Sequence, residues 1–167
     1  VFEDVAAAAG PTADAVIADL YCGLGTFGMA LARRAREVFG VEPDAWNIAG
    51  LKKNLELNGI GNFAVCEGKA EEWLPEVLER APAVVILDPP RRGVDPAIVR
   101  GLVDDPVPRI LYLSCNPTTL ARDLKGLLAA YDVADVRVYD FFPHTPHIET
   151  LERDTTPLNN TAGRPER

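Results

Sequence analysis

Short apolar runs alternate along the chain with segments in which apolar residues recur every three or four positions. The short runs are typical of strands, and the wider spacing is typical of helices. We therefore expect strands at residues 15–21, 37–42, 62–67, 83–88, 109–114 and 136–142. Between them we expect helices near residues 27–36, 45–59, 70–80, 95–104 and 118–130.

The expected strands are apolar at almost every position and not only at every second one. Strands of this kind are buried on both faces, as in parallel sheets that helices cover on either side. The pattern therefore indicates an α/β fold with a mostly parallel central sheet and helices on both faces. In such folds the ligand binds at the carboxyl ends of the strands.

Several residues with chemical potential come directly after an expected strand. They are Gly23, Gly25, Glu42, Asp88 and Cys115. Because the carboxyl ends of parallel strands share one edge of the sheet, we expect these residues to meet in one cleft.

The chain has 167 residues, of which 47% are hydrophobic, and this suits a single globular domain. Its net charge of -8 argues against a stand-alone nucleic-acid binder, because neutralising phosphates requires Lys and Arg. Three cysteines without a C-x-x-C spacing favour a reducing, cytoplasmic setting over a disulfide scaffold or a zinc site. No apolar run has membrane-spanning length, and a first residue of Val1 suggests a fragment of a longer protein.

The stretch "DLYCGLGTFG" contains the pattern G-x-G-x-x-G in Gly23, Gly25 and Gly28. Such glycines let a backbone approach a ligand closely at a strand-to-helix turn. The pattern fits a dinucleotide or S-adenosylmethionine, since both carry a ribose whose hydroxyls Glu42 is placed to bind. Asp19, at the end of the preceding strand, would repel a pyrophosphate but suits a cationic sulfonium. We therefore favour S-adenosylmethionine and keep a nicotinamide-dependent dehydrogenase as an alternative.

Two further stretches carry candidate chemistry. "YLSCNPTTLARD" places Cys115 between a strand and a helix, where the helix amides favour negative charge on sulfur, so it is a candidate nucleophile. "DFFPHTPHIETL" holds His144, His147 and Glu149. The two prolines there argue against a helical metal site, and we interpret Glu149 as a general base opposite Cys115. We expect no metal.

Taken together, "DLYCGLGTFG", "LDPPRRG", "SCNPTTLARD" and "FPHTPHIE" resemble the RNA uracil-C5 methyltransferase family, whose members make 5-methyluridine in transfer or ribosomal RNA. The resemblance runs from about residue 15 to residue 151. It implies a Rossmann-like S-adenosylmethionine-dependent methyltransferase fold and an RNA partner. It also implies a catalytic domain over residues 1–151. The polar, Pro-containing sequence of residues 152–167 predicts a flexible tail. After "HIETL" the family continues as an apolar strand, whereas "ERDTTP" is charged here, so we expect a short or frayed last strand. The amino-terminal RNA-binding region of the family is absent before Val1.

The resemblance also implies roles for individual residues. Cys115 matches the nucleophile that adds to C6 of uracil, and Glu149 matches the base that removes the C5 proton. Asp88 would lie between cofactor and base. The remaining cofactor contacts would come from Tyr21, Gly23, Gly25, Thr26 and Glu42.

Two other functions stay open at this stage. A cytosine-C5 RNA methyltransferase often carries its cysteine in a "PPC" loop, where this chain has Arg91. A non-catalytic cofactor- or RNA-binding fragment is the second alternative.

Overall fold

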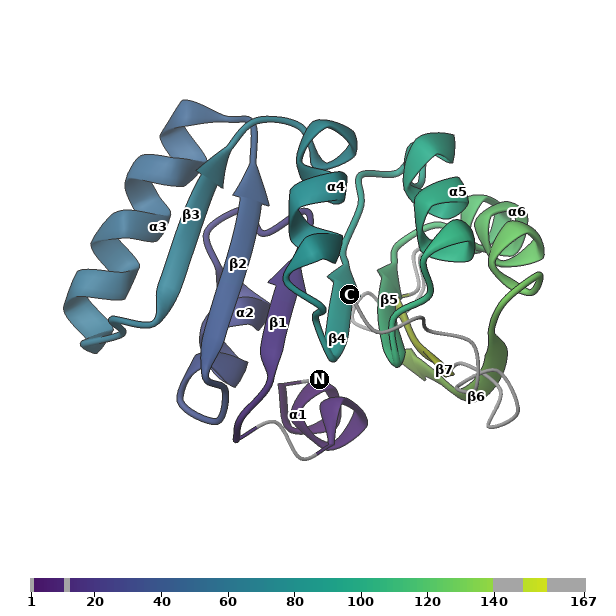
Figure 1. The fold of residues 1–167 in the computed structure, drawn as a ribbon, viewed down its shortest axis with the longest axis horizontal. Coiled ribbons are helices and arrows are strands. Elements are labelled where there is room, and N and C mark those ends of the chain that lie inside the picture. The colour runs from purple at the N-terminus through teal and green to yellow at the C-terminus, as the bar shows by residue number, and fades with distance from the viewer. Residues whose placement is uncertain (1, 11–12, 140–148, 156–167) are drawn as a thin grey trace.

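The computed structural model describes residues 2–10, 13–139 and 149–155. In these residues one seven-stranded sheet runs through the molecule in the order β3-β2-β1-β4-β5-β7-β6 (Figure 1). The strands are β1 (Val16–Asp19), β2 (Glu37–Glu42), β3 (Phe63–Glu67), β4 (Val84–Leu87), β5 (Arg109–Ser114), β6 (Asp132–Tyr139) and β7 (Glu149–Thr155). Strands β1 to β5 pair in parallel, and β7 is antiparallel to both of its neighbours.

Helices cover both faces of this sheet, as Figure 1 shows. They are α1 (Phe2–Ala9), α2 (Thr26–Ala32), α3 (Ala45–Asn58), α4 (Ala70–Glu79), α5 (Pro96–Asp104) and α6 (Pro117–Leu127). Helices α4, α5 and α6 pack against one face in a single apolar cluster, and α1 and α2 pack against the other. None of these helices is long and apolar enough to cross a bilayer.

The central strands show why their sequences are apolar throughout. In β5, Ile110 and Tyr112 belong to the cluster under α4, α5 and α6, whereas Leu111 and Leu113 belong to the cluster under α1 and α2. Successive side chains of a strand point to opposite faces, so a strand covered on both sides buries all of them. The predicted α/β fold with a mostly parallel sheet and helices on both faces is confirmed.

The expected helices and strands lie close to the observed ones, and the differences fall near the two ends of the chain. Helix α1 was not expected, because its "AAAA" segment shows little contrast between apolar and polar positions. Strand β6 begins at Asp132, earlier than the expected residue 136, and residues 140–142 of the expected strand lie outside the described residues.

The last strand is longer than expected. Its charged sequence predicts a short or frayed strand followed by a tail from residue 152, but β7 continues to Thr155 and pairs with β5 and β6 along its length. Two neighbouring strands satisfy the backbone of β7, and this tertiary pairing overrides the polar side chains. Residues 156–167 of the expected tail lie outside the described residues.

This pairing buries charge in the sheet. Glu152 and Asp154 lie opposite Tyr112 and Ile110 of β5 and are almost completely buried. One carboxylate oxygen of each, Oε2 of Glu152 and Oδ2 of Asp154, accepts no hydrogen bond from the described residues. Burial raises the pKa of both carboxyls to about 7, and the neighbouring Asp154 charge adds to the effect on Glu152.

This burial predicts a pH-dependent stability that Asp154→Asn removes. The raised folded-state pKa means that the folded chain holds more protons than the unfolded chain between about pH 4 and pH 7. Below its unfolded-state pKa, Asp154 is protonated in both states, so its ionisation does not lower the free energy of unfolding. As the pH rises, this loss of stability grows until the pH passes 7. We expect Asp154→Asn to raise the free energy of unfolding by about 2 kcal/mol at pH 8 and by much less at pH 5, measured by urea titration. Asp14→Asn, at an exposed carboxylate, serves as the control. An equal gain for Asp154→Asn at both pH values would contradict the assignment.

Candidate functional site

The expected site residues share one edge of the sheet. The loops that follow β1, β2, β4 and β5 hold or adjoin Gly23, Glu42, Asp88 and Cys115, at the carboxyl ends of these strands. Strand β7 runs in the opposite direction, so its first residue, Glu149, lies at the same edge. The prediction that these residues share one edge of the sheet is confirmed for their backbone positions, and their meeting in one cleft stays a prediction.

The glycine loop after β1 has a conformation that its sequence requires. Gly23 and Gly25 adopt positive φ angles of 52° and 84°, which favour glycine. Gly28 donates its backbone N–H to Oδ2 of the buried Asp19 at 2.9 Å. A Cβ atom on Gly28 would lie 2.7 Å from the Phe63 ring and 3.0 Å from Asp19 Oδ2. The third glycine therefore serves close packing, and Asp19 anchors the loop to the end of its strand.

Glu42 connects this loop to the end of β2. Its Oε2 accepts the Gly23 N–H at 3.0 Å, and its Oε1 accepts the Asp44 N–H at 2.9 Å and the Asn47 side-chain amide at 3.1 Å. Each carboxylate oxygen has two lone pairs, so Oε2 keeps acceptor capacity beyond these bonds. The carboxylate is 7% exposed, and it lies beside the open side of Gly23, where a Cβ atom would meet nothing within 4 Å.

The acidic groups at this edge suit a positively charged ligand. Burial raises the pKa of Asp19 to about 7, the Gly28 N–H opposes that shift, and the negative charges of Asp88 and Glu42 add to it. Oδ1 of Asp19 is buried and has no hydrogen-bond partner in the described residues. A cation placed here would relieve both the unpaired oxygen and the mutual repulsion of the carboxylates. A pyrophosphate would aggravate the repulsion.

Two other expected cofactor residues also lie near the loop. Tyr21 is half-buried, and its hydroxyl accepts the Asp95 N–H at a long 3.4 Å. Thr26 is exposed at the first position of α2. Their contacts with a cofactor stay predictions.

Helix α6 holds the loop that follows β4. The Asn116 side-chain amide donates to the Arg91 carbonyl at 3.0 Å, and the Thr119 hydroxyl donates to the same carbonyl at 3.3 Å. The Arg122 guanidinium donates to the Arg92 carbonyl at 3.0 Å. The D-P-P-R-R-G loop is thus fixed against the helix that begins just after Cys115.

Asp123 is the residue that the sequence analysis missed. Its buried Oδ2 accepts the Tyr112 hydroxyl at 2.7 Å and the Val94 N–H at 3.0 Å, and its Oδ1 lies 2.6 Å from Arg122 Nη2. One carboxylate thereby joins β5, α6 and the loop after β4. Its signal was the terminal Asp of "SCNPTTLARD", a polar residue on the buried side of a helix.

The three cysteines differ in exposure. Cys115 is partly exposed between β5 and α6, whereas Cys22 and Cys66 are buried. Burial raises the pKa of the Cys22 and Cys66 thiols above the ordinary value, so both stay protonated at neutral pH. Of the three, Cys115 has the exposure that a nucleophile requires.

The register of β5 and β7 relates Cys115 to Glu149. Ser114 pairs with Thr150 at the last position of β5, and Glu149 itself pairs with Tyr139 of β6. The β5–β7 ladder ends at the Ser114–Thr150 pair, and one further step in the same register would set Cys115 opposite Glu149. Directly opposed residues of an antiparallel pair have Cα atoms about 4.5–5.5 Å apart. The side chain of Glu149, together with His144 and His147, lies outside the described residues.

No group of three or more potential ligands is suited to a metal ion in the described part of the chain. The expected absence of a metal therefore stays untested for His144 and His147.

A family model described as tRNA (Uracil-5-)-methyltransferase matches residues 78–152, and one described as Conserved hypothetical protein 95 matches residues 1–104. The first covers the loop after β4, Cys115 and Glu149. The second covers the glycine loop and Glu42.

Relatives and solved structures agree with these matches. An uncharacterized RNA methyltransferase of Thermosynechococcus vestitus is 43% identical over 87% of this chain and 33% of its own length. Another from Enterococcus faecalis is 39% identical over 90% of this chain and 34% of its own. The chain thus spans about a third of the length of these relatives.

The crystal structure of Pyrococcus abyssi tRNA (uracil-54, C5)-methyltransferase in complex with S-adenosyl-L-homocysteine matches with a TM-score of 0.72. It is 31% identical, and the match covers 92% of this chain and 37% of that one. An rRNA methylase from Streptococcus thermophilus has the same TM-score at 13% identity and shows the same fold.

The Asp123 junction predicts a measurable coupling between Tyr112 and Asp123. We expect Tyr112→Phe and Asp123→Ala to destabilise the chain singly. The double variant should be more stable than the sum of the two losses implies, by about 1–2 kcal/mol, because each single change already removes the 2.7 Å bond. Urea unfolding of the four proteins measures this coupling. Tyr131→Phe paired with Asp123→Ala is the control, since the Tyr131 hydroxyl bonds to Val107 and Leu102 instead. Strict additivity for Tyr112 and Asp123 would show that the bond contributes nothing.

Proposed function

The chain belongs to the RNA uracil-C5 methyltransferase family, and from this membership we propose that it transfers a methyl group from S-adenosylmethionine to C5 of a uridine in tRNA or rRNA. The β5–β7 register carries the proposal, because it supports a nucleophile at Cys115 and a base at Glu149 that both reach one substrate ring. The matching relatives are RNA methyltransferases by name, and one solved relative acts on a tRNA uracil.

The glycine-loop end of the edge would hold the cofactor. When bound, S-adenosylmethionine supplies a methyl group attached to a positively charged sulfur. The acidic surroundings of Asp19, Glu42 and Asp88 favour such a cation. The open backbone of Gly23 and the remaining acceptor capacity of Glu42 suit a ribose. Further contacts would come from Tyr21, Gly25 and Thr26.

Cys115 addresses the central chemical problem of this reaction. C5 of uracil is a weak nucleophile. Addition of the Cys115 sulfur to C6 forms an S–C6 bond and moves the ring electrons toward the O4 enolate, which makes C5 nucleophilic. C5 then accepts the methyl group.

Glu149 would complete the cycle. After methylation C5 carries both the methyl group and its original proton. The Glu149 carboxylate takes this proton, the electron pair restores the C5–C6 double bond, and the S–C6 bond breaks to return the Cys115 thiolate. Asp88 would hold the uracil ring beside the cofactor, where orientation contributes much of the rate. The loop that carries Asp88 is fixed by α6, which supports this positioning role.

The two catalytic assignments predict different failures. We expect Cys115→Ala to abolish both 5-methyluridine formation and covalent trapping on 5-fluorouridine RNA, while the dissociation constant for S-adenosylmethionine stays within about twofold. Glu149→Gln should lower turnover by at least about a hundredfold but still form the covalent RNA adduct, because only proton removal is lost. Nucleoside analysis and denaturing gels provide the two readouts.

Cys66→Ala is the matched control, since it removes a buried thiol in β3, which strands β2, β1 and β4 separate from β5. It should retain turnover and trapping. A Cys115→Ala variant that still makes 5-methyluridine would refute the nucleophile. A Glu149→Gln variant with normal turnover would refute the base.

A further inference from the structure

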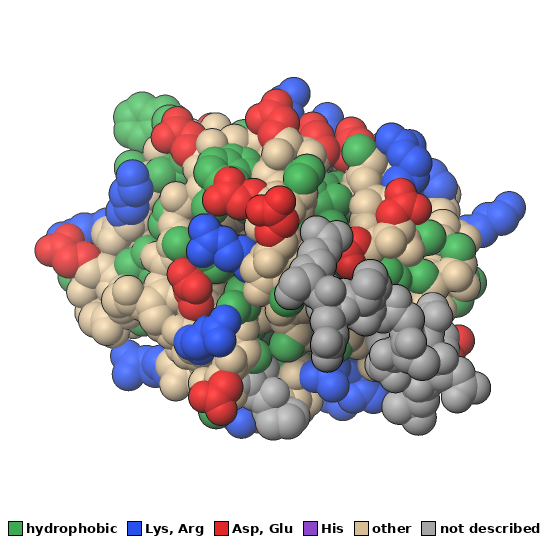
Figure 2. Space-filling view, viewed as in Figure 1, with side chains coloured by type: hydrophobic (Ala, Val, Ile, Leu, Met, Phe, Trp, Pro, Cys, Tyr) green, Lys and Arg blue, Asp and Glu red, His purple; other side chains and the backbone are tan. Residues whose placement is uncertain are grey.

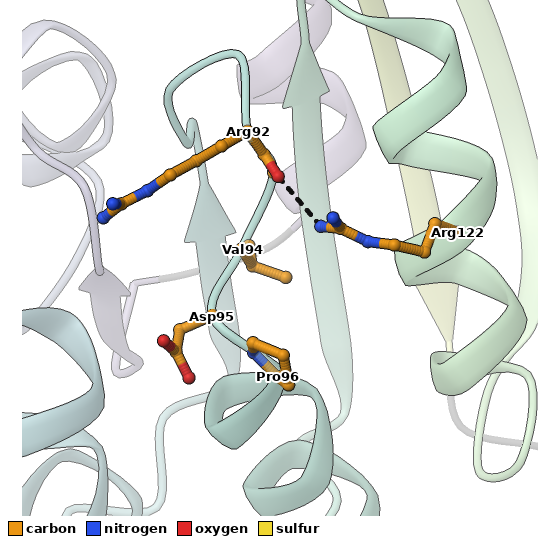
Figure 3. Close-up of a pocket in the computed structure, with 6 residues that line it drawn as sticks. Arg92, Val94, Asp95, Pro96 and Arg122 are labelled. Atoms are coloured by element: carbon orange, nitrogen blue, oxygen red, sulfur yellow. Dashed lines mark hydrogen bonds between the residues drawn. The ribbon is translucent and has the colours of Figure 1, made fainter.

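A pocket of about 260 Å³ lies beside the loop that follows β4 (Figure 3). It is lined by Arg92, Gly93, Val94, Asp95, Pro96 and Arg122. None of these residues has a role in the chemistry assigned above. The pocket is bounded by the start of α5 and by α6, and the Asn116–Arg91 bond links its loop to the residue after Cys115.

The pocket is built by a tight turn. Gly93 donates to the Pro90 carbonyl at 2.8 Å and adopts a φ of 81°, so Arg91 and Arg92 stand at the tip of the turn. A Cβ atom on Gly93 would lie 2.4 Å from both Arg122 Nη2 and Asp123 Oδ2. Only glycine at this position lets α6 approach the loop so closely, and this approach brings Arg122 to the pocket wall.

Two arginines line the pocket. Arg92 is exposed, and the Arg122 side chain is 55% exposed although it pairs with Asp123. Both nearby carboxylates accept backbone N–H groups: Asp95 accepts the Ala97 N–H, and Asp123 accepts the Val94 N–H. The pocket thus offers two guanidinium groups that reach solvent, of which Arg122 is shared with Asp123. Figure 3 shows Arg92 and Arg122 reaching to opposite sides of the loop backbone.

The chain as a whole is acidic. The chain carries a net charge of -8, and on the face in Figure 2 acidic and basic side chains are mixed without a continuous basic surface. An RNA strand that reaches Cys115 must therefore be held by local clusters of cations. The arginine cluster adjoins Cys115 through Asn116.

We propose that this pocket binds the phosphate backbone of the RNA strand next to the target uridine, with Arg92 and Arg122 as the phosphate contacts. The inference rests on the proposed function. Guanidinium groups suit phosphate because their planar donors form paired, charge-assisted hydrogen bonds with its oxygens. Arg122 also positions the loop through the Arg92 carbonyl, so Arg92 is the cleaner residue to test.

The test measures binding of the 167-residue chain to a short oligouridylate over a series of salt concentrations. We expect Arg92→Ala to weaken binding about three- to tenfold and to reduce the slope of log affinity against log salt by about 0.7, the value for one single-strand phosphate contact. Arg92→Lys should keep most of the slope. Arg36→Ala removes an equal charge just before β2, at the opposite edge of the sheet, and should change neither quantity.

The other outcomes separate the two proposals. If wild type binds oligouridylate and Arg92→Ala keeps the wild-type slope, the phosphate site is wrong while the proposed function stands. If Arg92→Ala instead weakens S-adenosylmethionine and leaves the salt slope unchanged, Arg92 serves the cofactor and the inference is again wrong. If wild type binds no oligouridylate, the proposed RNA substrate is wrong, and so is this inference.

Discussion

The antiparallel pairing of β5 with β7 is the constraint on which the site depends. It joins residues that are far apart in the sequence and sets the register that ends in the Ser114–Thr150 pair. Because side chains alternate between faces with a period of two, a slip of one residue would move position 149 to the other face of the sheet. The pairing also forces Glu152 and Asp154 into the interior. The strand that aligns the proposed base thus carries a stability cost.

Buried carboxylates make the loops around the site rigid. Asp19 anchors the glycine loop through Gly28, and Asp123 anchors the loop after β4 through Val94. Glu42 adds a third anchor through Gly23. In each case a side chain at or near a strand end, or on a helix, accepts a backbone N–H from a loop that would otherwise need water. A reacting geometry held in this way before the substrate arrives lowers the cost of orienting it.

Much of the fold was predictable because strands that are buried on both faces carry apolar residues at almost every position, and the sequence shows this pattern. The strand at residues 109–114 was predicted at its observed bounds, and Gly59 ends α3 as expected, with a left-handed φ of 62°. The gathering of Gly23, Glu42, Asp88 and Cys115 at one edge followed from parallel topology alone. These features depend on local periodicity and on general rules of chain connection.

What escaped prediction depends on tertiary contacts. The length of β7 is set by two neighbouring strands, not by its own charged sequence. The role of Asp123 arises from Tyr112 and Val94, which lie elsewhere in the chain. The arginine pocket needs the close approach of α6 to Gly93, which no periodicity reveals.

The relation between positions 115 and 149 can be measured directly by disulfide formation. In a Cys22→Ser, Cys66→Ser background, Glu149→Cys should form a disulfide bond with Cys115 under mild oxidation. One further step of the β5–β7 register would bring the two Cα atoms within the distance range that disulfides require. Thr150→Cys, one step out of register, should react much less. Loss of both free thiols in Glu149→Cys, with recovery on reduction, is the predicted result. A Glu149→Cys protein whose thiols stay free under the same conditions would contradict the account.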